Sequence, residues 1–212
     1  GSMADEIEAV LDALVLFAAN YSDSDKINWG IVAAPDFNTS YFDKLKLVQQ
    51  LTTFTNFIPI LQGVKGTYLN GSSEMVYDAI YLSIQNLVDP SLHPIDKKTL
   101  AWGSSVAPSV PSIPNFNIAW REDANHVVVV FTDEDAQSYT KPKIEQKHII
   151  NLANKADKLS IYTFSPDVYK DGYTGWAPVS VNGSWYPLTN NQTVMFDSLM
   201  EILDETACGE SP

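Results

Sequence analysis

The sequence predicts an α/β protein in which an open, doubly wound, mostly parallel sheet lies between two layers of helices (α/β/α). Two observations support this prediction. Apolar residues recur at spacings of three and four in some segments and form short continuous runs in others. The run HVVVVF at 126–131 carries four consecutive valines, which is typical of a central parallel strand buried on both faces. Strands that alternate with helices in this way form an open sheet covered on both faces.

The first half of the chain is predicted to hold three helices and one strand. Apolar positions at helical spacing indicate an amphipathic helix over 4–19, and INWGIVAAP at 27–35 indicates a short buried strand. A second helix is expected after Asp43, and a third after Gly71-Ser72-Ser73. The residues on the inner face of the second helix would be Leu45, Val48, Leu51, Phe54 and Ile58.

The second half continues the alternation after a long insertion. Residues 89–117 are rich in Pro and Ser, and a loop of this length in a compact domain is usually functional. We expect this insertion to pack over the carboxyl edge of the sheet and to shape partner specificity. Beyond the valine strand, the pattern predicts a helix over 143–156, a strand over 158–166, an edge strand or hairpin over 175–189 and a closing helix over 194–206.

Composition narrows the function classes. A length of 212 residues fits a single domain over 1–212. The formal charge of -13 argues against nucleic acid or anionic lipid as a partner, because such partners require clustered Lys and Arg. No apolar run approaches the roughly 20 residues that span a membrane, and the single cysteine, Cys208, cannot form an internal disulfide.

The acidic triplet Asp133-Glu134-Asp135 follows the valine strand directly. In open α/β sheets ligands bind at the carboxyl ends of the strands, and hard cations prefer carboxylate oxygens. The triplet is therefore either a cation site or an ordinary acidic loop. A nucleophile elbow, a Gly-rich phosphate loop and zinc-type Cys/His spacing are absent from the sequence.

Two segments carry a family resemblance: GSSEMVYDAI at 71–80 and AWREDANHVVVVFTDEDAQS at 119–138. Within the predicted succession of helices and strands, they resemble a von Willebrand factor A domain, which has the integrin I-domain fold. The second segment is similar to a bacterial cell-envelope subgroup that often carries S-D-E-x-D-x-S here. The resemblance implies a divalent cation, Mg²⁺ or Ca²⁺, held by three loops in a metal-ion-dependent adhesion site (MIDAS).

The resemblance also assigns the metal ligands. In bacterial members the first loop is often D-x-S-G-S-M, so Gly1-Ser2-Met3 continues it and makes Ser2 a ligand, unless these residues are an expression scar. Asp133 matches the aspartate of the third loop, and Glu74 stands where the family has a threonine. Further candidate ligands are Ser72, Ser73 and Asp135.

The family's first strand, and the first Asp and Ser of its motif, have no counterpart in this sequence. In the family that strand is the middle of the sheet, and without it two neighbouring strand edges would be unpaired. The resemblance therefore implies either a complementing segment that supplies the strand or a rebuilt sheet. With only Ser2, Glu74 and Asp133 as ligands, we expect weak Mg²⁺ binding by this chain alone.

The function implied by the resemblance is adhesion rather than enzymatic catalysis. The domain would belong to a secreted or cell-surface protein of the bacterial envelope and would bind a protein or glycan through an acidic or oxygen group. One alternative is a structural protein-interaction domain with a degenerate, metal-free site. A second is a metal-dependent hydrolase that uses Asp133 and Asp135, although no base or nucleophile is visible for it.

Overall fold

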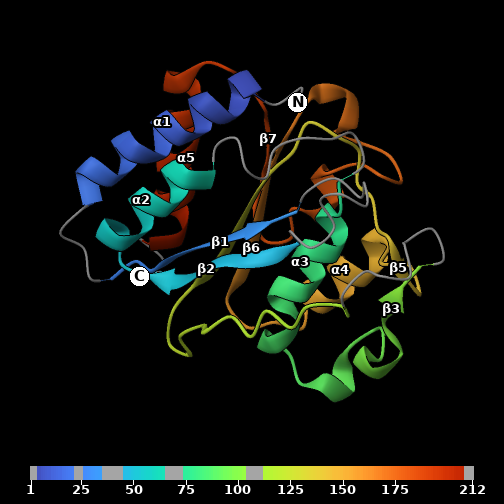
Figure 1. Cartoon of the computed structure of the whole chain (residues 1–212). Coiled ribbons are helices and arrows are strands. Elements are labelled where there is room, and N and C mark those ends of the chain that lie inside the picture. Colours follow the sequence, from blue (N-terminus) through green and yellow to red (C-terminus); the bar gives the residue numbers. More distant parts are fainter. Residues whose placement is uncertain (1–3, 22–25, 35–44, 65–73, 104–111, 208–212) are drawn as a thin grey trace.

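The structure is a computed structural model that describes residues 4–21, 26–34, 45–64, 74–103 and 112–207 (Figure 1). Over these ranges it is a mixed α/β protein, as predicted. The helices are α1 (Ala4–Tyr21), α2 (Phe54–Val64), α3 (Val76–Ile84), α4 (Gln146–Ala153) and α5 (Gln192–Ala207). The strands are β1 (Trp29–Ala33), β2 (Lys46–Thr52), β3 (Ala101–Trp102), β4 (His126–Phe131), β5 (Thr140–Lys141), β6 (Leu159–Ser165) and β7 (Trp185–Pro187).

The strands form three separate hydrogen-bonded sheets in the described part of the chain. The largest has the order β4-β6-β7, and all its neighbours are parallel. Strand β4 pairs with β6 without a register shift, from His126 opposite Leu159 to Phe131 opposite Phe164. β1 and β2 form an antiparallel pair, and β3 and β5 form a second, shorter one. The sequence predicted the parallel strands β4 and β6 and the edge strand β7.

Helices pack against both faces of the parallel sheet. On one face, α1, α2 and α5 share an apolar cluster with Val127, Val129 and Phe131 of β4. On the other face, α3 and α4 share a cluster with Val128 and Val130. This alternation follows from the period of two along a strand, which points successive side chains to opposite faces.

The predicted second helix is wrong in its first half. Residues 46–52 form strand β2, and α2 begins only at Phe54. Leu45, Val48 and Leu51 are spaced by three, which is typical of a helix. However, Leu45, Leu47 and Leu51 are separated by even numbers of residues, which also fits the period of two of a strand. In the structure those three leucines share one cluster, because pairing with β1 places one face of β2 against the core. Tertiary pairing therefore overrides the local spacing.

The insertion at 89–117 does not lie entirely where it was expected. The main-chain oxygens of Leu92 and Ile95 accept hydrogen bonds from Lys155 Nζ (2.7 Å) and Tyr81 Oη (3.3 Å). Residues 89–99 therefore pack beside the C-terminal parts of α3 and α4, toward the amino end of the parallel sheet. The chain returns toward the loop after β4 at β3, where Gly103 N donates to the main-chain oxygen of Tyr139. Residues 104–111 lie outside the described part.

The end of the insertion belongs to the core. Phe116 and Ile118 are buried in a cluster with Ala79 and Leu82 of α3, and Asn86 Nδ2 donates to the main-chain oxygen of Ile118 at 2.6 Å. This segment therefore contributes to stability, whereas we had expected the insertion to affect specificity more than stability. Among the described helices, none is long and apolar enough to cross a membrane.

Candidate functional site

The carboxyl edge of the parallel sheet brings together segments that are distant in sequence. Strands β4, β6 and β7 all end there, because parallel strands share one direction. The start of α3 reaches the same edge, since Tyr77 N donates to the main-chain oxygen of Gln137 at 3.1 Å. The side chains that follow β4 therefore meet those that precede α3, as expected for ligand sites in open α/β sheets.

Glu74 and Thr132 form the direct link between these two segments. The Thr132 hydroxyl donates a hydrogen bond of 3.1 Å to Glu74 Oε2 and accepts one of 3.2 Å from Glu134 N. Thr132 is completely buried, whereas Glu74 is half-buried. Asp133 follows Thr132 directly, so this hydrogen bond joins one predicted metal ligand, Glu74, to the residue that precedes another.

The acidic triplet is held in place by its neighbours. Trp176, which is completely buried, donates from Nε1 to the main-chain oxygen of Glu134 at 2.9 Å. Gln137 Nε2 donates to Asp135 Oδ1 at 2.7 Å, and Ala136 N donates to the main-chain oxygen of Thr174 at 3.2 Å. The loop after β4 is thus fixed both by its own side chains and by the segment after β6.

A second anchor of this edge is Asp78, in the first turn of α3. Its buried carboxylate accepts hydrogen bonds from Ser138 Oγ (2.6 Å), Tyr139 N (2.8 Å) and Thr140 Oγ1 (3.1 Å). Burial removes the charged form from water and raises the pKa of Asp78 to about 6, although the three hydrogen bonds oppose this shift. Sequence reasoning missed this role, because nothing local connects Asp78 to a loop sixty residues away.

A cavity of about 310 Å³ opens beside the acidic loop. It lies between the start of α3, the loop after β4, the start of α4 and the segment after β6. The side chains that give it its chemistry are Tyr77, Asp135, Gln137, Tyr139, Lys143 and Tyr173. Burial raises the pKa of the Tyr77 phenol above its ordinary value. The cavity therefore offers a carboxylate, an ammonium group and phenols at close range.

Exposed apolar surface lies along the segment that borders this cavity. Val168 and Tyr173 are 76% and 73% exposed, the highest values among the exposed large hydrophobic residues in the described ranges. Both follow β6, and Tyr173 lines the cavity while its hydroxyl donates to Glu145 Oε2 at 3.2 Å. Large apolar side chains left in water near a cavity are a feature of interaction surfaces.

The predicted metal ligands are only partly accounted for. Ser2, Ser72 and Ser73 lie outside the described residues. Glu74 and Asp133 flank the Thr132 contact, and Asp135 lies in the same loop but is hydrogen-bonded to Gln137. Within the described ranges, no three His, Cys, Asp or Glu side chains are grouped as metal ligands would be.

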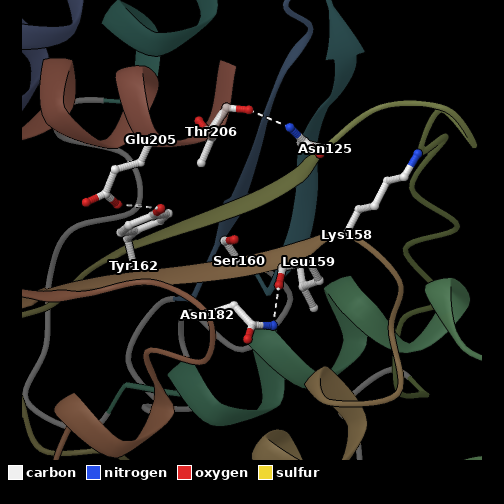
Figure 2. A pocket seen from close by; sticks show the side chains of 8 residues that line it. All are labelled: Asn125, Lys158, Leu159, Ser160, Tyr162, Asn182, Glu205 and Thr206. Atoms are coloured by element: carbon white, nitrogen blue, oxygen red, sulfur yellow. Dashed lines mark hydrogen bonds between the residues drawn. The ribbon is translucent and has the colours of Figure 1, made fainter. Parts of the chain in front are cut away.

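A larger cavity, of about 370 Å³, lies at the opposite, amino end of the sheet (Figure 2). Tyr162 Oη donates to Glu205 Oε2 at 2.9 Å, and Asn182 Nδ2 donates to the main-chain oxygen of Leu159 at 3.0 Å. Figure 2 shows Lys158 extending away from the Tyr162–Glu205 pair. The polar groups of this second cavity bond to one another and do not converge on a common point. The carboxyl edge is therefore the better candidate for the functional site.

Comparison of the sequence with protein-family models found no match, and comparison with curated proteins found none either.

Proposed function

We propose that this chain is a ligand-binding module of the von Willebrand factor A type and that it contacts its partner at the carboxyl edge. The observation that supports the proposal is the Thr132–Glu74 hydrogen bond, which joins the residue ahead of α3 to the residue that directly precedes Asp133. Helices on both faces of a parallel sheet are compatible with the doubly wound, three-layer fold of that family. The adjacent cavity and the exposed Val168 and Tyr173 supply a surface for the partner.

The proposed partner is a protein or glycan that presents a carboxylate or another oxygen group outside the cell or at the bacterial cell surface. In this proposal Ser2, Glu74 and Asp133 would hold Mg²⁺ or Ca²⁺, which when bound attracts the partner's oxygen. With Ser2, Glu74 and Asp133 as its ligands, we expect the ion to bind weakly, because Mg²⁺ requires near-octahedral coordination. As a ligand, Glu74 would also leave the ion with a lower residual positive charge than the family's threonine would leave it.

A metal-free interaction module is the second candidate function. The observation that favours it is the engagement of Glu74, whose carboxylate already accepts the Thr132 hydroxyl. In this alternative, partner contact would depend on Tyr173 and Val168 and would not change when divalent cations are removed.

The cation is tested by titrating MgCl₂ or CaCl₂ into the ¹⁵N-labelled chain while amide shifts are recorded by NMR. We expect shifts confined to Ser2 and its neighbours and to residues 74–78 and 132–138, with an affinity in the millimolar range or weaker, and loss of these shifts in Asp133→Ala. Asp123→Ala is the matched control, because Asp123 is exposed and precedes β4 at the opposite end of the strand. Tight binding that Asp133→Ala leaves unchanged would show that the site lies elsewhere.

Partner contact is tested by screening extracellular-matrix proteins and a glycan array with the chain in Mg²⁺ and in EDTA. Tyr173→Ser should weaken any specific binding at least tenfold. Leu92→Ser should not, because Leu92 is also exposed (50%) but lies near the amino end of the sheet. Binding lost in EDTA favours the cation-dependent mode, whereas binding retained in EDTA favours the metal-free mode. Binding that is insensitive to Tyr173→Ser excludes this edge.

A further inference from the structure

The wall of the cavity beside the acidic loop contains a buried hydroxyl, that of Tyr77. Tyr77 is 3% exposed, and its Oη has no hydrogen-bond partner among the described residues. The Gln146 side chain lies close to this phenol, but its Nε2 donates to the main-chain oxygens of Gly172 (3.3 Å) and Gly175 (3.1 Å). A buried polar group without a partner is costly, so a ligand hydroxyl that reached Tyr77 would remove a cost already present in the fold.

The side chains near that hydroxyl also line the cavity. Burial is the main cause of the raised pKa of Tyr77, and the nearby Asp135 and Tyr173 raise it further. Asp135 comes from the loop after β4 and Tyr173 from the segment after β6, and both line the cavity. Three segments of the chain therefore place a carboxylate and two phenols around one space.

Aromatic rings and fixed hydrogen-bonding groups are combined in this lining. Tyr77, Tyr139 and Tyr173 contribute three rings. Gln137 donates from Nε2 to Asp135 Oδ1 at 2.7 Å and accepts at Oε1 from the Tyr139 hydroxyl at 2.6 Å, so these polar side chains are held in one orientation. A carboxylate has more acceptor sites than one hydrogen bond uses, and Asp135 therefore retains the capacity to accept from a ligand.

The charges that line the cavity balance. Glu145 forms an ion pair of 2.6 Å with Lys147, so its charge is already compensated. Asp135 and Lys143 then contribute one charge of each sign. An ionic ligand would lose its hydration without gaining a net counter-charge. The lining therefore favours a neutral ligand, although the whole chain carries a formal charge of -13.

We propose that this cavity binds one neutral sugar ring, the terminal unit of a glycan, without a metal ion. A sugar ring presents C–H groups on its faces and hydroxyls at its edge, so it matches a lining of aromatic rings and fixed polar groups. The volume of about 310 Å³ is at the lower end of the roughly 300–1,000 Å³ of small-molecule sites, which fits one ring rather than an oligosaccharide.

Three side chains have separate roles in this complex. Asp135 accepts a hydrogen bond from a sugar hydroxyl, and the exposed ring of Tyr173 packs on a C–H face of the sugar. The Tyr77 hydroxyl, which is closed to solvent in the chain alone, bonds to a second sugar hydroxyl. Rotation of the Tyr173 side chain gives access to it and disturbs little packing, because Tyr173 is exposed.

The inference rests on the proposed function in one respect, because it takes a glycan and not a protein as the partner. The predicted cation ligands Glu74 and Asp133 do not line the cavity. Binding of the sugar ring should therefore persist when divalent cations are removed. The cation site and the cavity can fail independently of each other.

The experiment is a titration of the ¹⁵N-labelled 212-residue chain with methyl glycosides of glucose, galactose, mannose and N-acetylglucosamine in EDTA, followed by NMR. At least one of them should shift the amides of residues 135–139, 143–146 and 173–175, with a dissociation constant on the order of 1 mM. The amino-sugar and uronic-acid forms of the sugar that binds should bind about tenfold more weakly, because each carries a charge.

Tyr77→Phe is the decisive variant, since it removes only the hydroxyl. It should weaken the sugar about fivefold and should not lower the free energy of unfolding. Tyr186→Phe is the matched control: the Tyr186 Oη is also buried without a partner among the described residues, but Tyr186 lies on β7 and does not line the cavity. It should leave the affinity for the sugar unchanged.

Three results would overturn the proposal. They are no shifts with any of the four glycosides at tens of millimolar, shifts that lie outside the cavity, and equal affinity of the wild type and Tyr77→Phe. If no sugar binds but a protein partner binds and depends on Tyr173, the proposed function stands and this inference fails. If a sugar binds in the cavity and Mg²⁺ has no effect on the chain, the inference stands and the cation-dependent mode fails.

Discussion

The Ser138 hydroxyl donates a hydrogen bond of 2.6 Å to the carboxylate of Asp78, sixty residues earlier in the chain. Asp78 is completely buried and also accepts hydrogen bonds from Tyr139 N and Thr140 Oγ1. One carboxylate thereby fixes the loop after β4 to the first turn of α3. The acidic triplet begins the same loop, so its position depends on that anchor.

Asp78 should give the stability of this domain a specific pH dependence. Its pKa is raised from 3.8 to about 6 by burial, so between these values the folded state binds a proton that the unfolded state does not. Its stabilising contribution is fully present below about pH 4 and is lost as the pH rises through about 6. The shift corresponds to about 3 kcal/mol.

The measurement is urea unfolding of the wild type and of Asp78→Asn between pH 4 and 7, followed by tryptophan fluorescence. The free energy of unfolding of the wild type, relative to the variant, should fall by up to about 3 kcal/mol as the pH rises. Taking the difference removes the contributions of the other carboxylates, including Glu145, whose pKa is lowered mainly by its hydrogen bond with Lys147. A difference that stays constant with pH would show that Asp78 titrates normally.

The elements that the sequence predicted well are those in which local pattern and tertiary environment agree. The four valines of β4 and the run at 158–166 become parallel strands because each is apolar at consecutive positions. Residues 46–52 could not be assigned from the pattern alone. Their leucines fit a helix and a strand equally well, and pairing with β1 decides between them.

The candidate site was predictable in outline and not in detail. The family resemblance assigned Glu74 and Asp133 to one site, and in the structure Glu74 accepts a hydrogen bond from Thr132, which directly precedes Asp133. The contacts that fix the edge could not be inferred, because they join residues far apart in the chain. Trp176 reaches Glu134 over 42 residues, and a tryptophan among loop residues carries no signal that names its partner.

Trp176→Phe should loosen the acidic loop. The substitution leaves the main-chain oxygen of Glu134 without its donor and opens a small cavity beside Tyr77, whose ring packs edge-on at 5.5 Å. We expect a loss of about 2–4 kcal/mol in the free energy of unfolding. Hydrogen exchange of the amides at 133–137 should accelerate by more than the decrease in the global free energy of unfolding would produce.

Trp185→Phe is the control for that substitution. Trp185 also donates from Nε1, to Ser165 Oγ at 2.9 Å, but it lies on β7 and is half-buried. Its replacement should destabilise the domain by a smaller amount and leave exchange at 133–137 unchanged relative to global stability. If the two variants loosen the loop equally, Trp176 has no specific anchoring role.

The contact between Thr132 and Glu74 should show measurable energetic coupling. Thr132→Val keeps the shape of the side chain but removes the hydroxyl that joins Glu74 to Glu134 N, and Glu74→Gln removes the charge on the acceptor. Because Thr132 is completely buried, we expect Thr132→Val to cost about 1–3 kcal/mol. In a double-mutant cycle with Glu74→Gln, the coupling energy should be about 1 kcal/mol.

Thr132→Ser keeps the hydroxyl and should retain the coupling while losing only the packing of one methyl group. Strictly additive costs in the cycle would mean that the two segments approach each other without a bond between them, and the observation that carries the proposed function would then be lost.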